Sequence, residues 1–193
     1  MRETTPTMTR SQDDAAPPDP ARGETIEEIY DRYAPQVERW VRRLAGPGLD
    51  AEDLLHDIFL VVMRRRHEFR GEAKITTWLF CITQNVVRWR RRKDALRRFL
   101  WGTHGQAAAE ARATVPTPVE EVERREACGR LYAALDRMPE KYRTTLVLFA
   151  LEGLPGEEVA ALTGTDTSTV WVRLHRARAT LAALLAAGEE PSP

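Results

Sequence analysis

The chain has 193 residues, of which 42% are hydrophobic and 30% charged, and its 29 Lys and Arg balance its 29 Asp and Glu. This length and apolar content allow one large domain or two small ones. No apolar run approaches the roughly 20 residues of a membrane helix, so we expect no membrane insertion. The polar N-terminus lacks a signal-peptide core and the two cysteines form no CxxC pair, which predicts a cytoplasmic protein with reduced thiols. We predict no metal, no cofactor and no enzyme activity, because no metal-ligand spacing, phosphate loop or nucleophile triad is recognisable.

The positive charge is concentrated in one stretch, residues 64–98. It contains twelve Arg or Lys and three acids, so it carries a formal +9 and the rest of the neutral chain carries −9. Trp78 and Trp89 lie among these cations. Clustered cations with flat aromatic rings suit a polyanion whose bases can stack. The alternative is a solvated charged face of a helix.

The segment before the basic stretch predicts two helices. Residues 1–23 are polar and proline-rich and are expected to be a disordered tail. Apolar periodicity over 24–45 predicts a helix, which Pro35 kinks or splits into a pair. Asp50 is expected to cap a second helix. The apolar run at 58–63 is too wide for one face of that helix, so either a third helix covers the surplus or another protein binds it.

A third helix is predicted within the basic stretch. Its apolar stripe includes both tryptophans, which predicts that they anchor the core. The stripe consists of Ile75, Trp78, Leu79, Ile82, Val86 and Trp89. The opposite face presents amide and guanidinium groups, the chemistry that reads base edges and phosphates. Residues 101–118 contain small residues and prolines and are predicted to be a linker between domains.

The C-terminal part predicts a four-helix domain over residues 119–187, followed by a tail at 188–193. One helix runs to Met138 and a second starts at Pro139. A short helix over 156–163, a turn at Gly164 and a long helix to about residue 186 complete it, the long helix being capped by Thr165 or Asp166.

This ending is typical of a helix-turn-helix over 155–178, whose second helix binds in a DNA major groove. The alternative is an ordinary helical hairpin. The predicted fold class is all-α, with two small helical domains, 24–100 and 119–187, joined by a flexible linker.

Three segments carry a family resemblance: DAEDLLHDIFLVVMRRR at 50–66, FRGEAKITTWLFCITQNVVRWRRRK at 69–93, and residues 131–181. Together they resemble a bacterial RNA polymerase sigma factor of the extracytoplasmic-function (ECF) group of the sigma-70 family. The first two are similar to the family's region 2, which binds core polymerase and the −10 element. The third is similar to region 4, which binds the −35 element.

The resemblance implies three sets of site residues. The set that would dock on core polymerase is Asp50, Glu52, Asp53, Leu54, Leu55, His56, Asp57, Ile58, Phe59, Val62 and Arg66. The set that would hold a flipped base and the −10 strand is Lys74, Thr76, Thr77, Trp78, Gln84, Asn85, Arg88, Arg91 and Arg92. The set that would meet the −35 element is Ser168, Thr169, Trp171, Val172, Arg173, His175, Arg176 and Arg178.

Several of these residues depart from the family pattern: His56-Asp57 stands where the family often has Gln-Glu, and Thr83-Gln84-Asn85 where Ala-Arg-Asn is commoner. Trp171 and Val172 replace its usual Lys-Ser, and they could meet thymine methyl groups or pack against a partner.

The partners implied by the resemblance are core RNA polymerase, through its largest-subunit coiled coil and its flap, promoter DNA, and an anti-sigma factor. The free chain would be a monomer. Its implied function is to direct promoter recognition, strand opening and transcription initiation. The alternative is a stand-alone helix-turn-helix regulator, which would leave the basic stretch and the face of the second helix unused.

Overall fold

The computed structural model describes residues 23–101 and 119–187, and we find helices and no strand within these ranges. The predicted N-terminal tail apart from its last residue, the predicted linker apart from its first residue, and the predicted C-terminal tail lie outside the described residues. The N-terminal half consists of α1 (Ile26–Ala45), α2 (Ala51–Arg65), a 3-10 turn (Arg66–Glu68) and α3 (Ile75–Trp101). None of the helices in the described ranges is long and apolar enough to cross a membrane.

Local signals in the sequence set the ends of α1 and α2. Thr25 and Glu28 form a capping box at the start of α1, and Gly46, with a φ of +78°, ends it. Asp50 caps α2 by accepting hydrogen bonds from the backbone N–H groups of Glu52 and Asp53. Pro35 lies inside α1, which stays one continuous helix, so the predicted split into a pair is wrong.

The core of the N-terminal half lies between α1, α2 and α3. Trp40 of α1 is 2% exposed, and its ring meets that of Phe80 edge-on at 5.2 Å between centroids. Leu54 and Ile58 are buried between these helices, which cover most of the wide apolar face of α2. Of the two alternatives for the wide apolar face of α2, cover by other helices of the chain is therefore largely correct. Met63, at the end of the apolar run, remains 53% exposed.

The prediction that both tryptophans of α3 anchor the core is wrong for one of them. Trp78 is half-buried against Phe69, with ring centroids 5.3 Å apart. Trp89 is 56% exposed, and the Lys93 ammonium lies 4.9 Å from its ring centroid. The stripe drifts around the helix, so that Val87 takes the buried position near this end.

The C-terminal half consists of α4 (Val119–Asp136), α5 (Glu140–Leu146), a π-helical turn η4 (Val147–Leu151), α6 (Gly156–Thr163) and α7 (Thr167–Ala186). Gly164 has a φ of +63° and forms the turn between α6 and α7. Asp166 caps α7, which resolves the choice left open between Thr165 and Asp166.

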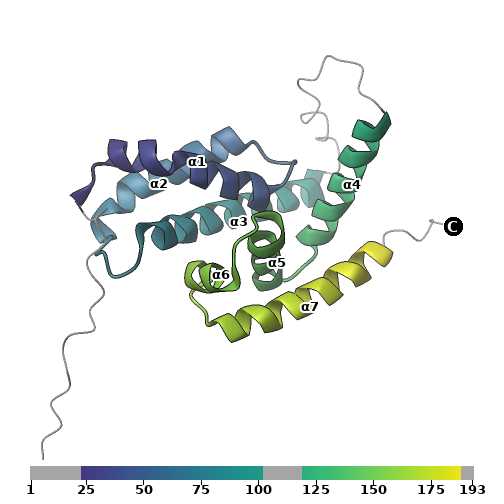
Figure 1. The fold of residues 1–193 in the computed structure, drawn as a ribbon. Coiled ribbons are helices and arrows are strands. Elements are labelled where there is room, and N and C mark those ends of the chain that lie inside the picture. Colours follow the sequence, from purple (N-terminus) through teal and green to yellow (C-terminus); the bar gives the residue numbers. More distant parts are fainter. Residues whose placement is uncertain (1–22, 102–118, 188–193) are drawn as a thin grey trace, which may run out of the picture.

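The two halves pack against each other in this conformation. Figure 1 shows α5, α6 and α7 on one side of the long helix α3 and α4 beside the C-terminal end of α3, and α6 contacts α3 directly. The buried apolar side chains of both halves form one contiguous cluster. The sequence predicted two domains and did not predict this contact.

Candidate nucleic-acid interface

The polymerase-binding set predicted on α2 divides into a buried part and an exposed part. Leu54, Ile58, Phe59 and Val62 are buried, so we correct their role from direct contact to support of the helix. The exposed part of the set consists of Asp50, Glu52, Asp53 and His56, while Leu55, Asp57 and Arg66 are half-buried. Two of these half-buried residues already have partners within the chain: Asp57 pairs with Arg90 of α3 at 3.3 Å, and Arg66 donates to the Glu24 carbonyl.

Two exposed apolar residues beside this face are absent from the predicted polymerase-binding set, although one of them belongs to the apolar run at 58–63. Met63 lies at the end of the apolar run of α2, and Tyr30 of α1 is 46% exposed with its ring edge-on to Phe59 at 4.7 Å. Their helical spacing could have identified them. They add an apolar patch to a row of acids, which suits binding to a protein.

The −10 set follows the loop before α3 and the outward face of that helix. Lys74, Asn85 and Arg92 are exposed, and Thr76, Thr77, Trp78, Gln84, Arg88 and Arg91 are half-buried. Arg88 donates to the Asn85 side-chain oxygen at 2.9 Å, so these two predicted DNA-binding side chains orient each other. Buried Thr83 donates to the Leu79 carbonyl and is not available to DNA.

A cavity of about 560 Å³ lies beside the start of this row. Phe69, Gly71 and Trp78 line it together with the charged side chains of residues 67–72. Aromatic walls and polar rims are the features with which proteins hold an extruded base.

The −35 set lies along the solvent-facing side of α7. Ser168, Trp171, Val172, His175, Arg176 and Arg178 are exposed, and Thr169 and Arg173 are half-buried. Val170, Leu174 and Ala177 are buried and fix the opposite side of α7 against its own domain. The helix can therefore present its polar and cationic side chains without losing its packing.

Trp171 packs in part on its own domain, an option that the sequence did not reveal. Its ring meets that of Phe149 edge-on at 5.5 Å between centroids, and the guanidinium carbon of Arg178 lies 5.9 Å from the Phe149 ring centroid. A Cβ on Gly156 would lie 3.0 Å from the Trp171 ring, so glycine makes room for the indole. Val172 remains 51% exposed and free to meet an apolar group.

Asp166 ties the first turn of α7 to its cap. Its carboxylate accepts from the Ser168 hydroxyl, and from the Thr169 N–H at 2.7 Å and hydroxyl at 2.8 Å. The Ser168 bond, followed by those from Thr169, lowers the pKa of the Asp166 carboxyl far below its ordinary value of about 3.9. Two predicted DNA contacts are thereby oriented by one carboxylate.

Because Asp166 caps α7 as a carboxylate, we expect the stability of this helix to fall at acidic pH. Since the folded pKa is depressed, the stabilisation is complete above the unfolded pKa and is lost as the pH falls below about 4 toward the folded pKa. Asp166→Asn keeps an acceptor for Thr169 but cannot titrate, so it should flatten the acid limb of a plot of thermal stability against pH. Ser168→Ala should remove part of that limb. An unchanged acid limb in Asp166→Asn would contradict the assignment.

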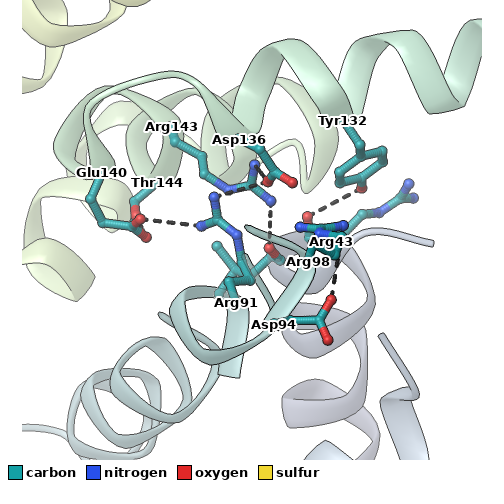
Figure 2. Close-up of polar contacts among 10 residues, drawn as sticks. Arg43, Arg91, Asp94, Arg98, Tyr132, Asp136, Glu140, Arg143 and Thr144 are labelled. Atoms are coloured by element: carbon teal, nitrogen blue, oxygen red, sulfur yellow. Dashed lines mark hydrogen bonds and ion pairs between the residues drawn. The ribbon is translucent and has the colours of Figure 1, made fainter. Parts of the chain in front are cut away.

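A polar network joins the two halves at the −10 row (Figure 2). Arg91 of α3, whose side chain is 14% exposed, pairs with Asp136 at 2.9 Å and Glu140 at 3.1 Å. Arg143 is fully buried and donates to the same Asp136 at 2.8 Å and to the Leu44 carbonyl at 2.7 Å. Burial, and then the neighbouring Arg91, lower the pKa of Arg143 to about 10, so it stays charged at neutral pH.

Further contacts extend this network along the interface. The Gln84 amide donates to the Thr144 hydroxyl at 2.9 Å, and the Tyr132 hydroxyl donates to the Arg43 carbonyl at 3.1 Å. Glu152, 6% exposed at its side chain, accepts from Arg39 at 3.0 Å. Gly46 lets the Tyr132 ring approach, because a Cβ there would lie 2.4 Å from a ring carbon.

Comparison with known proteins matches both halves. The family model described as Sigma-70 region 2 matches residues 29–97, and that described as Sigma-70, region 4 matches residues 128–181. The chain is 30% identical to the RNA polymerase sigma factor NccH of Alcaligenes xylosoxydans xylosoxydans, over 82% of this chain and 85% of NccH. It is also 30% identical to the RNA polymerase sigma factor CarQ of Myxococcus xanthus, over 84% of this chain and 90% of CarQ.

Two solved structures share the fold. One is CnrH in complex with the cytosolic domain of CnrY, at a TM-score of 0.54 and 23% identity, covering 86% of this chain and 93% of CnrH. The other is the sigma factor RpoE in complex with the anti-sigma factor NepR from Bartonella quintana, at 0.54 and 22%, covering 83% of this chain and 96% of RpoE. The chain is also 31% identical to the ECF RNA polymerase sigma factor SigM of Mycobacterium tuberculosis, over 83% of this chain and 76% of SigM. With region 2 and region 4 in this order and relatives matched over most of their length, the chain belongs to the extracytoplasmic-function group of the bacterial RNA polymerase sigma-70 factors.

Proposed function

We propose that this sigma factor binds core RNA polymerase through the outer face of α2 and opens promoter DNA along the outward face of α3. As a sigma factor it directs promoter-specific transcription initiation. The observation that carries the finer assignment is the division of α3 into a buried side and an outward row of amides and guanidinium groups. Such a row can hold the bases and phosphates of a separated strand.

In this proposal the two halves divide the promoter between them. Region 2 (residues 24–100) reads the −10 element, and the cavity beside Trp78 holds an extruded base. Region 4 (residues 119–187) places α7 in the major groove of the −35 element. The factor supplies binding energy and no chemistry of its own, and it acts in the cytoplasm with the polymerase.

Run-off transcription with core polymerase and a library of upstream sequences tests the function. We expect transcripts that start downstream of a shared pair of sequence elements. If the purified chain bound duplex promoter DNA tightly by itself and did not comigrate with core polymerase, the stand-alone regulator would be the better explanation.

An anti-sigma factor is a further proposed partner. The support is that RpoE, which shares this fold, was solved with the anti-sigma factor NepR. The neutral net charge of this chain is consistent with a factor that is stored without coating DNA.

The polymerase face of α2 can be tested with two substitutions that introduce the same charge. Met63→Asp places a carboxylate on the exposed patch, so we expect about tenfold weaker polymerase binding and a change in folding stability below about 1 kcal/mol. Phe59→Asp places it against Tyr30 in the core and should destabilise the fold by about 4 kcal/mol or more. Fluorescence anisotropy with core polymerase and urea denaturation distinguish the two effects. Normal polymerase affinity for Met63→Asp would contradict the docking surface.

A further inference from the structure

The outward side of α7 carries an apolar side chain near its centre. Val172 is 51% exposed, whereas the buried side of the same helix consists of Val170, Leu174 and Ala177. At about 100° per residue, each of these three lies within about 40° of the point diametrically opposite Val172. Val172 is therefore on the side of α7 that is farthest from its own domain, where a major groove would be deepest.

The neighbouring Trp171 lies on the flank of the helix instead. It is about 60–120° around the helix from the three buried residues. Its ring packs edge-on against Phe149, with 5.5 Å between the centroids, and Gly156 leaves room for the indole. The two adjacent apolar residues thus have different surroundings: Trp171 packs on its own domain, and Val172 faces outward.

The hydroxyl groups beside Val172 are already engaged within the chain. Ser168 and Thr169 both donate their hydroxyl hydrogen to the Asp166 carboxylate. Each hydroxyl has one hydrogen to donate, so in this arrangement neither can donate to a base edge. Val172, one turn after Ser168, is not packed against the apolar core of the described residues. Its isopropyl group is therefore open to a contact from outside.

A valine side chain can recognise a base pair only through an apolar contact, because it has neither a donor nor an acceptor. In the major groove, the apolar group that distinguishes one base from the others is the C5-methyl group of thymine. A G·C pair would instead place polar atoms against the isopropyl group, where they lose water without gaining a hydrogen bond. An outward valine at this position therefore favours thymine through burial of its methyl group.

We propose that Val172 sets the base preference at one position of the −35 element, by packing its isopropyl group against the methyl group of a thymine. This inference rests on the proposed placement of α7 in the major groove of that element. Thymine and uracil differ only in this methyl group, so the contact can be removed from the DNA while every hydrogen-bonding group of the base pair is kept.

Single replacements of thymine by deoxyuridine test the contact from the DNA side. The run-off library with core polymerase supplies the preferred −35 sequence, and each of its thymines is then replaced in turn. Affinity of the full-length factor in its complex with core polymerase is measured by competition against a fluorescent promoter duplex. We expect one replacement to weaken binding by wild type about three- to fivefold, as for one methyl group that is no longer buried. The same replacement should change binding by Val172→Ser less than about 1.5-fold.

Val122→Ser is the matched control, because Val122 is an equally accessible valine, 44% exposed, on α4. It should respond to the deoxyuridine replacement as wild type does. Both substitutions alter exposed side chains, so the thermal midpoints should stay close to that of wild type. In a second run of the promoter library, Val172→Ser should lose the thymine preference at that one position and keep the preferences at the others.

The outcomes separate this inference from the proposed function. If wild type gives promoter-specific transcripts but no deoxyuridine replacement weakens binding, or if the preferred −35 element contains no thymine, the inference is wrong and the function stands. An equal loss for wild type and Val172→Ser on the same replacement would also overturn it, because another side chain would then contact the methyl group. If wild type yields no promoter-specific transcripts, the proposed function itself fails.

Discussion

Arg143→Met is expected to lower the free energy of unfolding by about 2–3 kcal/mol. Arg143 is fully buried and donates both to the Leu44 carbonyl near the end of α1 and to the carboxylate of Asp136, the last residue of α4. Methionine removes a buried charge, which by itself is favourable, and fills much of the same volume. The loss of two hydrogen bonds outweighs this gain, because the Leu44 carbonyl is left without its charged donor.

This loss in free energy of unfolding is smaller than is usual for a broken buried ion pair, because Asp136, the acidic partner of Arg143, is not buried. The Asp136 side chain is 43% exposed, so water can solvate it once Arg143 is gone. Arg137→Met is the matched control, because Arg137 follows Asp136 in the chain and its side chain is exposed. The free energy of unfolding of this variant should stay within about 0.5 kcal/mol of wild type. Urea denaturation followed by circular dichroism measures both. Equal midpoints for the two variants would show that Arg143 does not join the halves.

Asn85→Ala and Arg88→Ala are each expected to slow promoter opening about tenfold to hundredfold while leaving polymerase affinity unchanged. Both residues lie on the outward face of α3, away from the exposed face of α2. Each loses one contact of about 1–3 kcal/mol with a base or phosphate. Because Arg88 donates to Asn85 at 2.9 Å, removing either residue also frees the other, so the double variant should be less impaired than the product of the single effects.

Permanganate reactivity of unpaired thymines in the open complex measures this effect. Polymerase affinity is measured in parallel by fluorescence anisotropy. Arg130→Ala, on the exposed side of α4, controls for the loss of one positive charge. A parallel fall in polymerase affinity and opening would place Asn85 and Arg88 at the polymerase interface and not at the DNA.

The same cations have different partners in the free chain and in the proposed complex. Arg91 is neutralised by carboxylates within the chain, although the sequence places it in a stretch of net charge +9. Likewise, Asp57 lies among the acids of α2 but pairs with Arg90. The chain has 29 basic and 29 acidic residues, and some of these opposite charges form ion pairs between segments that are far apart in the sequence.

The sequence by itself determined the local structure and the family. The cap at Asp50, a cap at Thr165 or Asp166, the turn at Gly164 and the 3.6-residue periodicity depend on near neighbours in the chain, so they could be predicted element by element. The two motifs in order identified a sigma factor, and the exposed side of α7 followed from spacing alone.

Only the tertiary structure decided which predicted contacts are buried and which are occupied. Trp89 was expected in the core and is exposed, whereas Phe59 was expected to contact the polymerase and is buried. Exposure depends on how far the neighbouring helices extend over an apolar stripe, which the spacing of residues does not give. Pairing of Arg91 with Asp136 joins residues 45 positions apart. No periodicity encodes such a contact, since it depends on how the two halves pack against each other and on a buried arginine that contacts both of them.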